Sequence, residues 1–139
     1  MQTWKDVEKA FVDSFSRFGK SAAVFRLPDT AMVKATAGPK AFLPDQPSDY
    51  VVVLDGDMFF AEVKSTQDAE AFHFSNLRKG QVNASRRAVS AGGKYLIFIY
   101  SFALSQWFCV PAQIIHHTSL VLKKKHLKWS ELEPYQYEL

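Results

Sequence analysis

The chain has 139 residues, of which 47% are hydrophobic, and a formal net charge of +3 with a pI of about 9.0. This length supports one compact domain with a substantial core and leaves too little for two, so we expect a single domain over residues 1–139. The apolar runs are far shorter than the roughly 20 residues that cross a bilayer, and the charged start lacks the apolar stretch of a signal peptide. These features predict a soluble, unexported protein without a membrane partner.

The first segment is predicted to be an amphipathic helix. Thr3 is a suitable N-cap. Large apolar side chains then recur at spacings of three and four residues from Trp4 to Phe18, until Gly19 ends the pattern. Glu8 lies at the edge of the apolar stripe rather than on the polar side. Because desolvating a lone carboxylate is costly, we expect Glu8 to have a partner.

The rest of the chain alternates short strands and helices. Strands are predicted at residues 21–27, 95–102 and 106–110, and a hairpin within residues 50–66. Helices are predicted at residues 77–91, from Pro111, and as a last turn near Leu132, where Ser130 and Glu133 have the spacing of a capping box. Residues 28–47 and 67–76 are expected to be connections, with one short apolar piece at residues 31–33 in the first.

The hairpin brings charged residues together at its open end. Asp55-Gly56 between two apolar runs predicts a two-residue turn, because both positions tolerate positive φ. This turn places Asp49 directly opposite Glu62, whereas a turn of odd length would shift the register. Side chains alternate along a strand, so Lys64 shares the face of Glu62.

Two opposed carboxylates repel each other unless a positive charge lies between them. Oxygen ligands with room for water suit a hard cation such as Mg²⁺. An amine beside them could orient or deprotonate an attacking water. The alternative is that Asp49 forms a local Asx turn and that Glu62 and Lys64 form an ordinary ion pair. The buried character of the second strand favours a site, because charges within such strands are seldom there for stability.

Pro47-Ser48-Asp49, twelve further residues and then Glu62-Val63-Lys64 resemble the PD-(D/E)XK nuclease pattern. Glu8 matches the N-terminal acidic position of that superfamily, and residues 72–102 and the C-terminal tail are similar to RecU-type Holliday junction resolvases, while archaeal-type resolvases share the core pattern. The resemblance implies an α/β fold with a restriction-endonuclease-like core, a mixed central β-sheet flanked by helices. It also implies that residues 31–46 form a junction-contacting loop.

The resemblance further implies that Asp49, Glu62 and the carbonyl of Val63 bind Mg²⁺, with Mn²⁺ as a substitute, and that Lys64 positions the attacking water. Glu8 would hold a metal-bound water or a second ion. Gln81, in the helix at residues 77–91, would orient Lys64 or a phosphate oxygen. The implied reaction is hydrolysis of a phosphodiester by in-line attack of water, leaving a 5′-phosphate and a 3′-hydroxyl.

The expected partner is branched DNA. Basic groups at residues 78–79, 86–87, 123–125 and 128 suit phosphate contacts or a solvated polar face, and charge alone leaves both interpretations open. The residues expected to contact DNA are Arg26, Ser48, Ser65, Thr66, Arg78, Lys79, Arg86 and Arg87. Phe42 could be a wedge that separates bases, or a loop residue packed on the core.

The function that follows is an Mg²⁺-dependent endonuclease that resolves four-way junctions by paired incisions in the cytoplasm of a bacterial cell, encoded by the host or by a virus. Paired incisions in a two-fold junction require a two-fold enzyme, so we expect a homodimer. The alternatives are another PD-(D/E)XK nuclease, acting as a restriction-like, flap or repair enzyme, and a noncatalytic DNA-binding module of the same fold.

We expect the cysteine, the neighbouring histidines and the serines of this chain to have structural rather than catalytic roles. Cys109 is the only cysteine, so one chain can form neither a disulfide nor a thiolate cluster, and its apolar surroundings predict a buried, unreactive thiol. Neighbouring histidines at positions 116 and 117 point about 100° apart on a helix and cannot easily clamp one ion. Ser75, Ser85 and Ser90 lack a recognisable base or nucleophile elbow.

Overall fold

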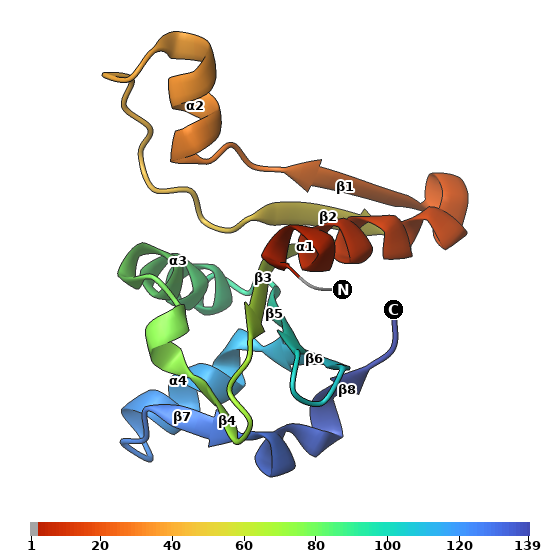
Figure 1. Cartoon of the computed structure of the whole chain (residues 1–139), viewed down its shortest axis with the longest axis vertical. Coiled ribbons are helices and arrows are strands. Elements are labelled where there is room, and N and C mark those ends of the chain that lie inside the picture. Colours follow the sequence, from red (N-terminus) through yellow and green to blue (C-terminus); the bar gives the residue numbers. More distant parts are fainter. Residues whose placement is uncertain (1–2) are drawn as a thin grey trace.

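The computed structural model describes residues 3–139, which fold around one six-stranded mixed sheet (Figure 1). The strands lie in the order β1-β2-β3-β5-β6-β8; β3 and β5 are parallel and the other neighbours are antiparallel. Their bounds are β1 (Ala22–Arg26), β2 (Tyr50–Leu54), β3 (Asp57–Thr66), β5 (Tyr95–Ser101), β6 (Gln106–Pro111) and β8 (Gln136–Tyr137). The prediction of a mixed central sheet flanked by helices is confirmed.

The first helix, α1 (Trp4–Asp13), is shorter than predicted. Its N-cap is Thr3, as expected, and its hydroxyl accepts a hydrogen bond from the Asp6 amide at 3.3 Å. The apolar spacing continues beyond Asp13, but there the backbone tightens into a 3-10 helix, η1 (Ser14–Ser21), which contains Gly19 at a φ of 56°. A residue spacing of three or four fits both kinds of helix, so the pattern could not locate this change.

The hairpin of β2 and β3 has the predicted register. Leu54 pairs with Asp57 around a turn whose two residues, Asp55 and Gly56, have φ of 52° and 80°. Tyr50 pairs with Ala61, so the next pair outward is Asp49 and Glu62. β3 then runs parallel to β5, which places the second half of β3 in the middle of the sheet, between β2 and β5.

Helices cover the two faces of the sheet and give it two apolar cores. On one face, α1 packs its buried Val7 and Phe11 against Tyr50, Phe59 and Phe98. On the other face lie α3 (Lys79–Ser90) and α4 (Ala112–Leu120), whose core includes Ile97, Ile115 and Leu132. No helix within residues 3–139 combines the length and the apolar character that a membrane span requires.

Two predictions for the connections and the tail are corrected. Residues 67–76 are not a plain loop, because they contain β4 (Ala71–His73), which pairs with β7 (His126–Lys128), and a short 3-10 helix, η2 (Phe74–Asn76). The last helical turn is a 3-10 helix, η3 (Trp129–Tyr135). Its cap is formed by Lys128 and Glu131 rather than by Ser130 and Glu133, since the Glu131 carboxylate accepts from the Lys128 amide at 3.0 Å.

Residues 28–47 contain a helix that the sequence pattern did not predict, α2 (Thr30–Ala37). The Asp29 side chain caps it by accepting from the Met32 amide at 2.8 Å. No residue of α2 is buried, and Figure 1 shows α2 projecting from one end of the molecule, beyond the sheet. Because α2 buries no apolar face, it leaves no helical periodicity of the kind that predicts a packed helix.

Candidate active site

Asp49 is held at the start of β2 by backbone and side-chain contacts. Its carbonyl oxygen accepts a hydrogen bond from the Leu27 amide at 2.9 Å, and its Oδ2 accepts from the Val63 amide at 3.0 Å. The second bond links the carboxylate to β3, next to Glu62, so this carboxylate bridges the hairpin instead of forming a local Asx turn. Ser48 supports the same segment by donating its hydroxyl to the Tyr50 carbonyl at 2.7 Å.

Glu62 is a fully buried carboxylate in the interior of β3. Its exposed fraction is 0%, and neither of its carboxylate oxygens has a hydrogen-bond partner among the described residues. Burial, reinforced by the nearby charge of Asp49, raises the pKa of Glu62 to about 8. An ionised carboxylate is costly in this position unless a cation neutralises it.

Lys64 lies two residues further along β3 and faces the same side as Glu62. Its Nζ is 3.4 Å from Oε2 of Glu62, and only 18% of its side chain is exposed. The predicted Glu62–Lys64 pair is therefore present, but it lies in the sheet rather than on the surface. One ammonium beside two carboxylates leaves the cluster of Asp49, Glu62 and Lys64 with a formal charge of −1 when all three are ionised.

Glu8 approaches the cluster from α1, on the other face of the sheet. It is half-buried, and its Oε1 accepts a hydrogen bond from the Tyr50 hydroxyl at 2.9 Å. Burial raises the pKa of Glu8, the Asp49 charge adds to that rise, and the Arg26 charge opposes it. Tyr50 is thus the hydrogen-bond partner that was expected for Glu8. The Glu8 carboxylate is also close enough for the Asp49 charge to affect its pKa.

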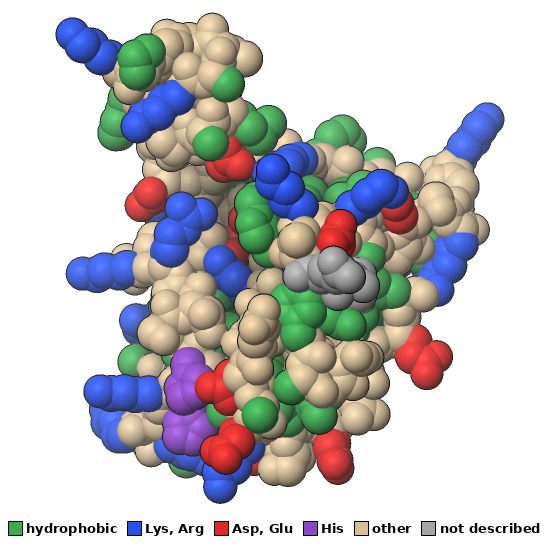
Figure 2. Space-filling view, viewed as in Figure 1, with side chains coloured by type: hydrophobic (Ala, Val, Ile, Leu, Met, Phe, Trp, Pro, Cys, Tyr) green, Lys and Arg blue, Asp and Glu red, His purple; other side chains and the backbone are tan. Residues whose placement is uncertain are grey.

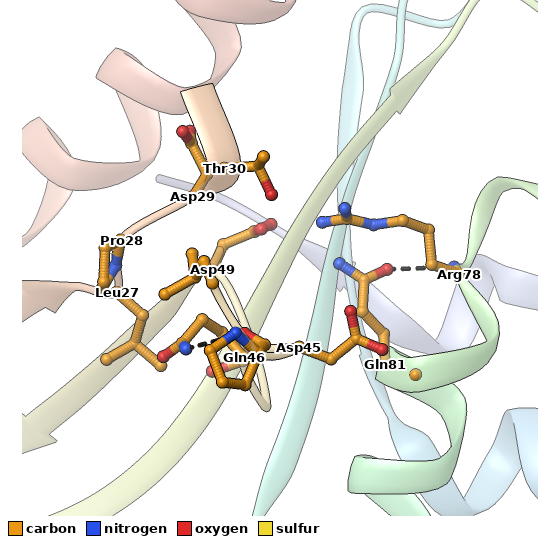
Figure 3. Close-up of a pocket in the computed structure, with 13 residues that line it drawn as sticks. Leu27, Pro28, Asp29, Thr30, Asp45, Gln46, Asp49, Arg78 and Gln81 are labelled. Carbon is orange, nitrogen blue, oxygen red and sulfur yellow. Dashed lines mark hydrogen bonds between the residues drawn. The ribbon is translucent and has the colours of Figure 1, made fainter. Parts of the chain in front are cut away.

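A pocket opens between Asp49, the start of α2 and the start of α3 (Figure 3). Arg78 and Gln81 reach into it from the α3 side, across from Asp49. Gln81 is 95% buried, since its exposed fraction is 5%, and its Oε1 accepts from the Arg78 amide at 3.1 Å. Its amide oxygen is therefore engaged in capping α3, and its amide nitrogen remains as the group that can orient a ligand.

The residues expected to contact DNA occupy different settings. Arg78, Lys79, Arg86 and Arg87 are exposed on α3 or at its start, and Figure 2 shows Lys and Arg side chains gathered along the edge that carries α2 and α3. Phe42 is 84% exposed, so it is not packed on the core.

The other residues expected to contact DNA are paired or less exposed. Arg26 pairs with Asp29 at 3.1 Å, and Ser65 and Thr66 are partly buried. Ser48 is 3% exposed, with its hydroxyl already donated.

The histidines and serines make one contact that sequence reasoning missed. Ser85 Oγ lies 2.8 Å from Nε2 of His116, so Ser85 does have a histidine neighbour. The same Oγ donates to the Val82 carbonyl at 2.7 Å and is buried, which leaves it without the freedom of a nucleophile. The His73 ring lies tilted by 40° against that of His126, with ring centroids 5.5 Å apart, and its Nε2 lies 3.2 Å from Asp68.

Two tyrosines that the sequence analysis did not single out support the site. Tyr50 donates to Glu8, and Tyr95 donates its hydroxyl to the Pro47 carbonyl, which fixes the segment that leads into Asp49. Burial raises the pKa of both tyrosines, so they act as hydrogen-bond donors at neutral pH. Alternation along β2 was the available signal for Tyr50, because it points to the face opposite Asp49.

Comparison with known proteins identifies the family. The model of RecU, Recombination protein U, matches residues 33–139. The chain belongs to the RecU family. The matched RecU region includes Asp49, Glu62, Lys64 and Gln81 and begins after α1, so Glu8 lies outside it. Family membership supports a Holliday junction resolvase, the endonuclease function expected from the resemblance.

The fold is similar to that of a solved resolvase structure. The chain is similar to Archaeoglobus fulgidus Hjc, described as a Holliday junction resolvase from an archaeal hyperthermophile, with a TM-score of 0.62 and 16% sequence identity. The similarity covers 96% of this chain and 94% of that one. A comparison with curated protein sequences gave no match. The predicted resolvase-type nuclease fold is confirmed.

Proposed function

We propose that this RecU-family chain cleaves four-way DNA junctions at the cluster of Asp49, Glu62 and Lys64, using Mg²⁺ for which Mn²⁺ can substitute. The observation that carries the proposal is the Glu62 carboxylate, which is buried completely, makes no hydrogen bond within the described residues and has only the Lys64 ammonium, 3.4 Å from Oε2, as an ion-pair partner. A structural carboxylate would be expected to have hydrogen-bond partners. A divalent cation bound by its oxygens would supply the missing contacts.

The donor set fits a hard cation. Within residues 3–139 no group of three or more His, Cys, Asp and Glu side chains is placed to hold a metal ion, so Glu8 does not form a three-carboxylate site with Asp49 and Glu62. Asp49 and Glu62 would be the two side-chain ligands. The carbonyl of Val63 and solvent would complete an oxygen shell, which suits Mg²⁺ and Mn²⁺ better than Zn²⁺. When bound, the ion neutralises charge that develops on the phosphate and on the leaving oxygen.

The remaining roles belong to side chains of the chain itself. Lys64 would hold the attacking water in line with the scissile bond and stabilise negative charge on the phosphate. The Gln81 amide nitrogen would hold a phosphate oxygen, since its amide oxygen is engaged by Arg78. Glu8, kept in place by Tyr50, would orient solvent at the α1 side of the site. The products would be a 5′-phosphate and a 3′-hydroxyl.

The surroundings of the cluster suit branched DNA. Exposed Arg78, Lys79, Arg86 and Arg87 would contact phosphates along α3. The projection, residues 29–46, carries the exposed Phe42, which would insert at the branch point where bases lose a stacking neighbour. The proposed site of action is the cytoplasm of a bacterial cell, with the chain encoded by the host or by a virus.

The active form would be a homodimer, because two symmetric incisions require two sites related by a two-fold axis. An exposed apolar sheet face supports this assembly. Phe25 and Met58 are 57% and 48% exposed and lie with Val51 and Val53 on the face of β1, β2 and β3 opposite α1. A second copy of the chain would cover this face. Phe25→Asp should give a monomer in sedimentation experiments, whereas an unchanged dimer would exclude this interface.

A cleavage assay tests the function directly. Labelled four-way junction, flap and plain duplex are incubated with the protein in Mg²⁺ and, separately, in chelator. We expect symmetric nicks in the junction, only with the metal, and none in the duplex. Equal cutting of all three substrates would instead indicate a general nuclease, and binding of the junction without any product would indicate a noncatalytic binding module.

A further inference from the structure

A groove between α1 and β1 lies on the α1 face of the sheet and carries two aromatic side chains, Trp4 and Tyr50, beside several charged ones. Its lining includes Trp4, Lys5, Glu8, Lys9, Arg26 and Tyr50. In Figure 2, Lys and Arg side chains lie over α1 and β1 on this side of the molecule. The lining has three cations and two carboxylates, Glu8 and Asp13, so the groove is weakly basic, and it reaches Glu8 at the edge of the cleavage site.

Trp4 is exposed in a way that the other tryptophans are not. It is 57% exposed, whereas Trp107 is 6% and Trp129 is 5% exposed. Lys5 Nζ lies 5.7 Å from the centroid of the Trp4 ring, so a cation already accompanies the exposed indole. Large aromatic rings are usually buried in cores or at interfaces, and one left open beside cations matches the platforms on which proteins stack bases.

The position of Trp4 relative to Glu8 fits one strand of DNA. The two residues are four apart on α1, so they lie on the same face, with a rise of about 6 Å between them. Stacked bases of one strand are about 3.4 Å apart. A strand that passes Glu8 would therefore bring a base over Trp4 about two nucleotides away.

The charges along the groove agree with this path. Lys5, Lys9 and Arg26 border it, and Lys9 and Arg26 are each paired with an acidic residue, Asp13 and Asp29 respectively. Phosphates that approach from solvent could exchange with these exposed carboxylates, because surface ion pairs contribute little. A neutral apolar ligand would gain no charge pairing from the three cations that line the groove.

We propose that Trp4 stacks on an unstacked base of the junction close to the cleaved phosphate, while Lys5, Lys9 and Arg26 contact phosphates of the same strand. This inference rests on the proposed function and adds a base-stacking position to it. At a branch point a base loses one stacking neighbour, and the Trp4 ring replaces it. Stacking is tolerant of sequence, so Trp4 favours branched over continuous DNA without selecting a particular base.

Tryptophan fluorescence can measure the contact between Trp4 and a base. The other two tryptophans are buried, so a change in emission or in iodide quenching on DNA binding reports on Trp4. Junction is titrated into the protein in chelator, which prevents cleavage, and iodide quenching of the emission is measured. In the wild type, junction should lower the emission and protect it from iodide. In Trp4→Phe both changes should disappear. Persistence of both changes in Trp4→Phe would overturn the proposal.

A coupling experiment locates the base. Affinity for labelled junction is measured for the wild type, Trp4→Ala and Trp4→Phe, with Leu104→Ala as a control that removes a 50% exposed apolar side chain from the β5–β6 turn. Trp4→Ala should weaken binding about tenfold, Trp4→Phe should restore most of it, and Leu104→Ala should have no effect. Removing one base within three nucleotides of the cut should weaken the wild type about tenfold and leave Trp4→Ala unchanged.

The outcomes separate this inference from the function on which it rests. Wild-type affinity in Trp4→Ala, or an equal loss with every abasic junction in both proteins, would overturn the stacking position while junction cleavage remained intact. Failure of the wild type to bind or cut any junction would overturn both. Abasic sensitivity that depends on Trp4 would support the stacking position.

Discussion

The sheet end that carries Asp49 and Glu62 differs from the projection at residues 29–46 in how it is held. At the sheet end, hydrogen bonds from Leu27, Val63 and Tyr95 fix the backbone and the Asp49 carboxylate, and Glu62 is fully buried. In the projection, α2 has no buried residue and Phe42 is 84% exposed. The first region is positioned by the fold and the second is left open to solvent.

The projection should therefore tolerate substitution better than the sheet end. Chemistry requires groups held to within a fraction of an ångström, and the hairpin and the β3–β5 pairing provide that rigidity. Recognition of a branched substrate requires surface that can reach into it, and the projection provides that. One close approach joins the projection to α3: a Cβ on Gly80 would lie 2.5 Å from Oδ2 of Asp45.

The largest expected effect is on cleavage at the sheet end. Asp49→Asn and Glu62→Gln each remove one anionic ligand and keep the side-chain shape, so junction cleavage should fall at least about a hundredfold while junction binding persists. Cleavage rates and band shifts with the same labelled junction measure both quantities. Glu133→Gln, the same change at an exposed carboxylate of η3, provides a control outside the cluster that should keep the cleavage. Cleavage by Glu62→Gln at the wild-type rate would contradict the proposal that Glu62 is a metal ligand of the cleavage site.

The next effect is on stability and compares two phenylalanines. Phe98 lies in β5, paired with Val63 of β3, and Phe42 lies in the projection. Phe98 is 2% exposed and contacts Phe11 and Phe59, so Phe98→Ala should lower the free energy of unfolding by about 3–5 kcal/mol. Phe42→Ala should change it by less than about 0.5 kcal/mol. Urea unfolding followed by circular dichroism gives both values. A large loss of stability in Phe42→Ala would show that the projection packs on the domain.

The third effect is a pH dependence at the sheet end. Because the fold raises the pKa of Glu62 from 4.5 to about 8, its protonated form contributes stability in the absence of divalent ions. That contribution is complete below pH 4.5 and is lost as the pH rises to about 8, by about 1.4 kcal/mol for each unit.

Glu62→Gln isolates this contribution, because the amide does not titrate. The unfolding free energy of the wild type, minus that of Glu62→Gln, should fall between pH 5 and pH 8 in chelator. Saturating Mg²⁺ should reverse the decline, since the ion binds the ionised form. A difference that stays constant across this range would mean that Glu62 is not held in a desolvated site.

The smallest effect concerns selectivity. Phe42→Ala should reduce the preference for junction over duplex by a few-fold, because a wedge contributes only where bases are unstacked. Competition binding with labelled junction and unlabelled duplex measures the ratio. Met32→Ala, a 41% exposed residue of α2, serves as the matched control. An unchanged ratio of junction to duplex affinity in Phe42→Ala would exclude the proposed role of Phe42 as a wedge.

The same contrast explains what could be predicted from the sequence. The Asp55-Gly56 turn and the alternation of β2 and β3 determine the register locally, so the pairing of Asp49 with Glu62 followed from nearby residues. α2 was missed because it buries no apolar face, and β4 was missed because its partner, β7, lies about 50 residues away in the chain. Tyr95 supports Pro47 from β5, a contact that only the assembled sheet creates.

Asp49 and Glu62 should share one divalent cation. Calorimetric titration of Mn²⁺ into the DNA-free protein at pH 8 measures this binding, with Asp49→Asn, Glu62→Gln and a surface control, Asp13→Asn, run in parallel. Either site substitution should weaken Mn²⁺ binding at least tenfold, and the control should leave it unchanged. Mn²⁺ binding that survives both site substitutions at full strength would contradict a shared cation.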